Sequence, residues 1–376
     1  MGKDTPVKIS EHFKTLTDPR IVGRTNHKLI DIVTIALCAI ICGADNWPEI
    51  ESYGKAKYDW FKEFLQLPNG IPTQHTFRRF FIAVSVDELE NCFLNWVKSV
   101  FNTSKSKVVP IDGKTLRRSH DRSSNKAAIH MVNAWCVENG ISLGQIKTSE
   151  KSNEITAIPE LIKTLELTGC IVTIDAMGCQ TKISESIIDK GADYIFALKG
   201  NQGNLNKDVE LFFEESRQNN FKDIAFDSYT TIDGDHGRIE TRKYTTVSEI
   251  DWLQGKENWK QLKTIIMVES QRDVNDEISD ETRYYISSME NCAEEIGKAV
   301  RSHWGVENGL HWKLDIGFRE DECRKRKGNA AANFAIMRQI ALNLLNQEKT
   351  IMKAGLKAKR LRAGWDNDYL LNVLNV

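Results

Sequence analysis

Three carboxylates stand where a folded chain rarely leaves a lone acid. Asp112 follows the apolar run of residues 108–111, and Asp175 follows a second run at 170–174. Both runs are typical of buried strands, and ligand sites gather at the carboxyl ends of parallel strands. If the two strands are neighbours, we expect both acids to project into one crevice.

The third acid is Glu307, which helical spacing places in an otherwise apolar stripe. That stripe consists of Ile296, Val300, His303, Leu310 and Leu314. A lone buried carboxylate is costly, so it normally pairs, shifts its pKa or binds a metal ion. We therefore expect Glu307 to be a buried functional acid. Its rivals for the same role are Asp315, Glu320 and Asp321.

Three converging carboxylates supply the oxygen ligands that Mg²⁺ or Mn²⁺ prefers. Two such ions ~3.5–4 Å apart clamp the attacking and leaving oxygens of a phosphodiester displacement. A single Asp or Glu more often pairs with an arginine or caps a helix. The combination of three acids with neighbouring basic segments instead predicts a site with two Mg²⁺ or Mn²⁺ ions that acts on nucleic acid.

A nucleotide-binding loop is excluded by spacing. The stretch VVPIDGKTL, residues 108–116, ends in the GKT of such loops. The loop also needs a glycine five residues before Gly113, because that glycine lets backbone N–H groups surround the phosphates. Val108 stands there instead. We therefore expect no nucleotide cofactor.

The 376 residues have a formal net charge of −1, but the charges are segregated. Residues 324–362 carry eleven Lys or Arg and one acid, and residues 105–126 carry seven against two acids. Basic blocks in a near-neutral chain predict an anionic partner such as DNA. The phosphate-binding candidates are Lys114, Arg117, Arg118, Lys199, His236, Arg238, Arg242, His303, Arg324, Lys325, Arg326 and Lys327. A solvated charge run is the competing interpretation, strongest for 349–362.

The stretch LPNGIPTQHTFRRFF, residues 67–81, predicts a turn followed by a short helix with Thr73 as its N-cap. The first turns of a DNA-recognition helix present polar and basic side chains in this way. The candidates here are Gln74, His75, Arg78 and Arg79. The alternative is an ordinary surface helix.

The element pattern predicts an α/β fold, a mixed sheet with flanking helices. Residues 107–199 alternate as β-β-β-α-β-α-β, with a hairpin at Asn139-Gly140 and a helix that begins at Pro159. Further helices are expected over 293–312 and 329–347. We expect a helical N-terminal DNA-binding domain at 1–103, the first part of the α/β domain at 104–202, a β-rich insertion at 203–290, further helices of the α/β domain at 291–347 and a basic tail at 348–376.

The eight cysteines show no CxxC pairing, so neither a zinc site nor a disulfide framework is expected. The most apolar stretch, 29–42, is shorter than the ~20 residues of a membrane span and contains Asp31. It predicts a buried helix and no membrane partner. No secretory signal is recognisable, so we expect a cytoplasmic protein that joins the nucleoid when bound to DNA.

Several motifs resemble insertion-sequence transposases of the ISAs-one type, the H-repeat-associated family. They are VPIDGKTLRRS, TIDAMGCQ, DYIFALKGNQ, DHGRIETR and the long run from HWGVENGLHWKL to NLL at 303–345. The resemblance implies a DDE transposase with an RNase H-like catalytic domain and metal-binding acids at Asp112, Asp175 and Glu307. It also implies binding to the element's terminal inverted repeats, cleavage and transfer into target DNA, and a homodimer on double-stranded DNA. Many such enzymes carry Arg and Lys where this chain has His303 and Leu314.

Two other functions remain compatible with the sequence. One is a catalytically silent DNA-binding remnant of such a transposase. The other is an RNase H-like nuclease that recognises DNA structure instead of sequence.

Overall fold

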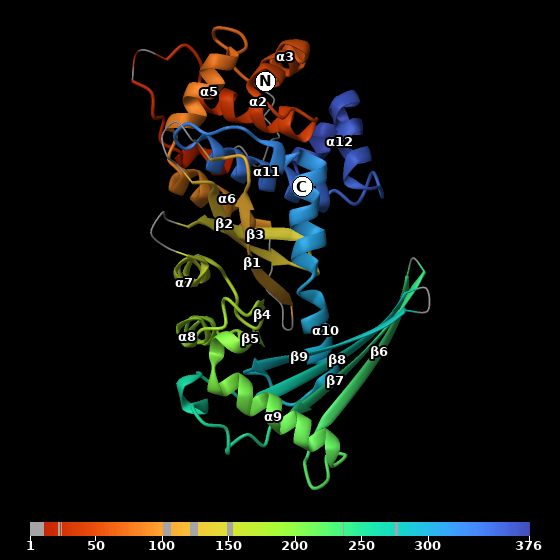
Figure 1. The fold of residues 1–376 in the computed structure, drawn as a ribbon. Helices are drawn as coiled ribbons and strands as arrows, with labels where there is room; N and C mark the ends of the chain where they lie inside the picture. Colours follow the sequence, from red (N-terminus) through yellow and green to blue (C-terminus); the bar gives the residue numbers. More distant parts are fainter. Residues whose placement is uncertain are drawn as a thin grey trace. The chain divides into compact units, whose positions relative to one another are not determined.

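The structure is a computed structural model that describes residues 11–21, 23, 25–100, 107–120, 127–148, 153–235, 237–274 and 277–376. The chain forms two compact units, each assembled from separate stretches (Figure 1). Unit 1 combines residues 1–102, 113–151 and 307–376, and unit 2 combines residues 103–112 and 152–306. Strand β1 (Val108–Leu116) begins in unit 2 and ends in unit 1.

Unit 2 contains most of a mixed sheet. Its strands are hydrogen-bonded in the order β1-β4-β5-β9-β8-β7-β6. Besides β1 they are β4 (Ile171–Ile174), β5 (Asp193–Leu198), β6 (Asp227–Asp235), β7 (Arg238–Val247), β8 (Thr264–Val274) and β9 (Glu277–Ser287). The first three run parallel, and every later pairing is antiparallel. All four residues of β4 are buried, as its continuous apolar run predicts.

The helices of unit 2 correct two predictions. They are α7 (Glu154–Thr164), α8 (Thr181–Asp189), α9 (Asn204–Gln218) and α10 (Ala293–Ser302). Pro159 lies inside α7 instead of beginning it, because buried residues before and after the proline share one packing face. Helix α9 lies in a segment expected to be β-rich. Its buried Leu205, Val209 and Phe213 recur every four residues, a helical signal that the acidic composition obscured.

Unit 1 is mainly helical. Its helices are α2 (Leu29–Ile41), α3 (Trp47–Ala56), α4 (Tyr58–Phe61), α5 (Gln74–Ala83), α6 (Val86–Val100), α11 (Ala330–Gln347), α12 (Leu356–Trp365) and α13 (Asn367–Leu374). The hairpin of β2 (Ile129–Cys136) and β3 (Ile141–Lys147) turns at Gly140, whose φ of +65° favours glycine. The predicted α/β fold with a mixed sheet is confirmed.

Helix α11 is the centre of unit 1 and is buried on all sides. It packs against α2, α5, α6, α12, α13 and β3. Two of its polar side chains bond the β2–β3 hairpin. The Asn343 side chain bonds the backbone N–H and C=O of Ser142 at 2.7 and 2.8 Å. Gln339 donates to Asn133 and Gln145 at 2.6 and 2.7 Å. Buried amides that bond fixed partners hold one register between helix and strand.

Part of the basic tail is structural. Lys359 is buried and donates to the Leu345 carbonyl at 2.9 Å. Arg360 donates to the carbonyls of Ile40 and Ile41, at 2.9 and 3.2 Å, and so caps the C-terminal end of α2. The interpretation of residues 349–362 as a solvated charge run is therefore wrong for these two residues. In the described part of the chain, no helix is long and apolar enough to cross a membrane.

Candidate functional site

The two aspartates occupy matching positions on neighbouring parallel strands. In unit 2, β1 pairs with β4 so that Ile111 lies opposite Ile174. Asp112 and Asp175 are the next residues of their strands, and both are half-buried. Paired residues of parallel strands point to the same face of the sheet. β1 continues to Leu116, so Asp112 does not end the strand as predicted, but it lies where the pairing with β4 stops.

Asp175 is held by a tight turn. Its Oδ1 accepts hydrogen bonds from the backbone N–H of Met177 at 3.1 Å and of Gly178 at 3.2 Å. Those bonds use one carboxylate oxygen and set the direction of the other. A Cβ at Gly178 would overlap Ile174 and lie 3.1 Å from Ile158, so the turn requires glycine.

The loop after β5 braces the same turn. Asn201 donates to the carbonyl of Ala176 at 2.7 Å, and Gln202 donates to the carbonyl of Cys179 at 2.5 Å. Sequence reasoning singled out the motif ALKGNQ for Lys199 and missed these two amides. The sequence indicates this bracing role only weakly, because amide side chains are common in loops.

His303 lies on the face of the sheet that carries the aspartates. It follows the last residue of α10, and its Nδ1 lies 2.9 Å from Oγ1 of Thr173. Thr173 and Asp175 are two residues apart on β4 and share that face. Burial lowers the pKa of His303, although the Asp175 carboxylate acts in the opposite direction. Burial therefore disfavours a positive charge on this imidazole, and a contact of His303 with phosphate stays a prediction.

Glu307 is exposed, which corrects the prediction of a buried acid. The helical period of 3.6 residues breaks after α10, because Glu307–His311 and Lys313–Gly317 form π-helical turns. The wider turns bury Val306 in place of Glu307. Within unit 1, a Cβ at Gly309 would lie 2.9 Å from the Trp135 indole, so this glycine lets the first π-helical turn pack on β2.

The rival acids are neutralised by basic residues of β1 and of the segment that follows it. The ammonium of Lys114 lies 2.5 Å from Asp315 and 2.9 Å from Glu320, and it is 9% exposed. Arg117 lies 3.3 Å from Asp321. Among the acids considered for the third position, Glu307 alone lacks an ion pair within the described residues. This pattern favours Glu307 as the acid available to a ligand.

The register places Asp112 and Asp175 side by side where the β1–β4 pairing stops, and carboxylate oxygens are the ligands that a hard divalent cation prefers. Asp112 and Asp175 belong to unit 2, and Glu307 belongs to unit 1. In the part of the chain that the structure describes, no three His, Cys, Asp or Glu side chains are gathered closely enough to hold a metal ion.

Comparisons with known proteins show the family of this chain. Residues 103–344 match the family model of the transposase DDE domain, and residues 10–97 match a model described as DDE_Tnp_1-associated. The chain belongs to the DDE transposase family. The H repeat-associated protein YhhI of Escherichia coli K12 is 42% identical over 372 residues, 98% of this chain and 97% of that one.

Two further matches were found. The protein named inactive transposase YbfQ of Escherichia coli K12 is 38% identical over 72 residues, 19% of this chain and 86% of its own. A solved piggyBac transposase synaptic complex with hairpin DNA is 10% identical at a TM-score of 0.45, with 98% of this chain and 81% of that one covered.

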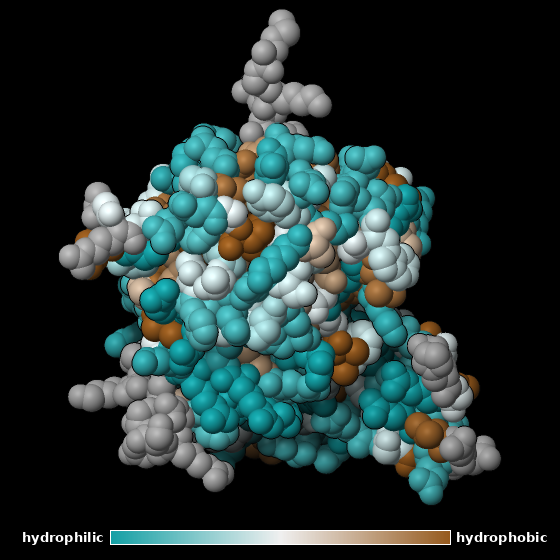
Figure 2. Space-filling view, turned by 90° about the horizontal axis from the view of Figure 1, so that it is seen from above, coloured by the Kyte–Doolittle hydropathy of each residue, from teal (hydrophilic) through white to brown (hydrophobic). Residues whose placement is uncertain are grey.

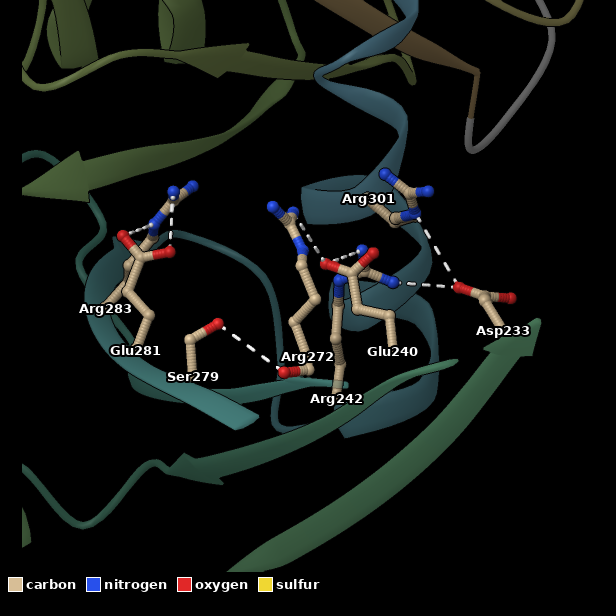
Figure 3. Close-up of polar contacts among 8 residues, drawn as sticks. All are labelled: Asp233, Glu240, Arg242, Arg272, Ser279, Glu281, Arg283 and Arg301. Atoms are coloured by element: carbon tan, nitrogen blue, oxygen red, sulfur yellow. Dashed lines mark hydrogen bonds and ion pairs between the residues drawn. The ribbon is translucent and has the colours of Figure 1, made fainter. Parts of the chain in front are cut away.

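Two of the transposase's predicted phosphate contacts are buried ion pairs instead. Lys114 is one, and Glu320 and Asp315 hold its pKa above the usual value although burial acts to lower it. Arg242 is the other, since its guanidinium lies between Asp233, at 2.8 Å, and Glu240 (Figure 3). Both cations neutralise carboxylates of their own unit, so the prediction that they contact DNA is corrected.

Other predicted cations are exposed. In unit 2 these are Lys199 and Arg238, and in unit 1 they are His75, Arg78, Arg79, Arg117, Arg118, Arg324 and Lys327. Gln74, Lys325 and Arg326 are half-buried, and His236 lies outside the described residues. Helix α5 begins at Gln74 as predicted, and it buries Phe77, Phe80 and Phe81 on the face away from the arginines. The face seen in Figure 2 is largely hydrophilic, with apolar residues in separate small groups.

Replacing Lys114 by methionine should destabilise the fold, because Glu320 and Asp315 would then lack their buried counter-charge. We expect a loss of about 3–5 kcal/mol in the free energy of unfolding in urea. The pKa of Lys114 is raised in the folded protein, so its ion pairs contribute fully to the free energy of unfolding below about pH 10.4, the pKa of an unfolded lysine. This contribution decreases at higher pH. The control is Arg117→Met, which removes an exposed pair and should cost less than about 1 kcal/mol. Equal losses for both variants would contradict the buried triad.

Proposed function

We propose that this chain is the transposase of an insertion sequence, which binds the element's terminal inverted repeats and cuts and joins DNA strands at Asp112, Asp175 and Glu307. The observation that carries the proposal is the β1–β4 register. It brings two carboxylates to one sheet edge in a chain of the DDE transposase family. Glu307 is proposed as the third ligand because the rival acids are paired with cations.

The three carboxylates would hold two Mg²⁺ or Mn²⁺ ions, which lower the pKa of a water or 3′-OH nucleophile and stabilise the leaving oxygen. The turn at residues 175–178 orients Asp175 before any ion binds. Neutral His303, held by Thr173, places the end of α10 beside this edge without adding a competing positive charge. The reaction exchanges one phosphodiester for another, so it needs no nucleotide cofactor.

Exposed cations would supply most of the DNA affinity through phosphate contacts, which makes binding depend strongly on salt. In this proposal α5 reads bases in the major groove through His75 and Arg79, both exposed on the helix. A transposition event joins two element ends, so two copies of the chain would act together on double-stranded DNA. The substrate would place the protein in the cytoplasm at the nucleoid.

Strand nicking on a duplex that carries the cognate element end tests the catalytic residues. With Mg²⁺, we expect Asp112→Asn, Asp175→Asn and Glu307→Gln each to lower the cleavage rate by about 10³-fold, the equivalent of several kcal/mol of lost charge stabilisation. Asp321→Asn, at an acid paired with Arg117, is the control and should cut normally.

Three results would change the assignment. Normal cleavage by all three variants would show that the acids are wrongly identified. Metal-independent binding to several end sequences without any cleavage would favour the silent remnant. Cleavage that follows forks or flaps and ignores the end sequence would favour a structure-specific nuclease.

The reading role of α5 predicts a loss of specificity. Arg79→Ala should weaken binding to the element end by about 1–3 kcal/mol relative to a scrambled duplex of equal length. Gel-shift competition between the two duplexes measures this difference. Lys349→Ala, an exposed cation away from α5, should leave the preference unchanged. If Arg79→Ala and Gln74→Ala both retain the full preference, α5 is a surface helix and another element reads the sequence.

A further inference from the structure

A basic cavity of about 870 Å³ lies within unit 1. Its walls come from the start of α3, from α5, from the segment 319–328 and from the start of α11. Seven of its lining residues are Lys or Arg and three are Asp or Glu. Two separate basic motifs therefore meet here, Arg78 of α5 and the RKRK run at 324–327.

Arg338 is the buried cation of this cavity. It projects from α11 and is only 2% exposed, and its guanidinium lies 4.7 Å from the centre of the Phe334 ring. Its Nε has no hydrogen-bond partner among the residues that the structure describes. A buried guanidinium with an unused donor is costly unless an anion accepts from it. The cavity that Arg338 lines is the place from which such an anion can approach.

Lys325 is a second cation of this cavity and is half-buried. Its Nζ donates to the backbone carbonyl of Asp45 at 2.5 Å and lies 3.6 Å from the centre of the Phe334 ring. Burial lowers the pKa of Lys325 to about 8. The side chain is therefore charged at neutral pH, but it loses its proton at a lower pH than an exposed lysine does. A ligand with negative charge would stabilise the protonated form.

The rim of the cavity adds further cations. Arg78, Arg324 and Lys327 line the cavity, are exposed and have no ion pair within the described ranges. The loop that carries Arg324 and Lys327 is tied to the end of α5, where the N–H of Asn329 donates to the Ile82 carbonyl at 3.1 Å. A Cβ at Gly328 would lie 2.8 Å from that carbonyl, and its φ is +53°, so glycine permits this close approach.

We propose that this cavity binds a phosphomonoester dianion. The sources of that group are the 5′-phosphate at a DNA strand end, which would deepen the proposed transposase function, and a small free phosphate. A terminal phosphate carries nearly two negative charges at pH 7, about twice the charge of an internal phosphodiester. The buried Arg338, the half-buried Lys325 and an open basic rim favour the more highly charged group.

Paired oligonucleotides test the proposal on the full-length protein. Two fluorescent single strands of identical sequence, one with a 5′-phosphate and one with a 5′-hydroxyl, are titrated by anisotropy, and inorganic phosphate is titrated by calorimetry. We expect the wild type to bind the phosphorylated strand at least about tenfold more tightly, an advantage of about 1.4 kcal/mol. Arg338→Lys and Lys327→Gln should reduce that advantage. Lys357→Gln, an exposed lysine of α12 outside the cavity, should leave it intact.

The oligonucleotide and inorganic phosphate titrations distinguish the two sources of the phosphate group. Preference for the phosphorylated strand identifies a DNA end, and inorganic phosphate binding without that preference identifies a small phosphate ligand. Equal binding of both strands and no inorganic phosphate binding would overturn the proposal. Lys327→Gln keeps the test valid if Arg338→Lys fails to fold, because Lys327 is exposed. Strand nicking at the catalytic acids is measured separately, so either function can fail alone.

A pH series adds a second readout. Lys325 is faced by Asp45 and Glu49, by Arg338 of α11 and by Cys323, whose pKa is lowered by Arg338 and Lys325 although burial acts to raise it. In a Cys323→Ser background, affinity for inorganic phosphate should fall as the pH rises above about 8 and Lys325 loses its proton. Lys325→Arg in the same background should flatten this fall, and an unchanged fall would contradict the role of Lys325.

Discussion

The parallel pairing of β1 with β4 is the constraint on which the proposed chemistry depends. It aligns Ile111 with Ile174, so the residues that follow are two carboxylates in matching positions on one face. Three features maintain the direction of the Asp175 side chain. They are the glycine at 178, the backbone N–H bonds to Oδ1, and the Asn201 and Gln202 amides of the loop after β5. In the proposed site these contacts would fix the direction of Asp175 before an ion binds, which is how preorganised sites gain their effect.

Charge neutralisation inside unit 1 complements this arrangement. Lys114 stands two residues after Asp112 and uses its charge on Asp315 and Glu320, so the acids nearest Glu307 in sequence are already satisfied. The exposed cations that remain belong to α5 and to the segment before α11. In this way the same chain contains structural cations, which stabilise the fold, and surface cations, which are available to phosphate. Sequence composition alone does not separate the two.

The strands and most helices could be predicted because their apolar patterns are periodic and their turns carry glycine or proline. Asp112 and Asp175 followed from two apolar runs, and Gln74 followed from a turn signal. Glu307 was expected to be buried but is exposed, since π-helical turns change the direction of its side chain and no residue type in the sequence indicates such turns. Lys114 and Arg242 were misjudged because their acidic partners lie far along the chain or across a strand pair. The meeting of Arg78 with the RKRK run likewise depends on tertiary packing, which no local pattern records.

We propose that Asp112, Asp175 and Glu307 share one metal site. Replacing Mg²⁺ with Fe²⁺ and generating hydroxyl radicals at the bound ion cuts the backbone only near its ligands, and mass spectrometry locates the cuts. The account predicts fragments that end close to residues 112, 175 and 307, with all three sets lost in Asp175→Asn and suppressed by excess Mg²⁺. Cuts near 112 and 175 without any near 307, or cuts concentrated elsewhere, would contradict it.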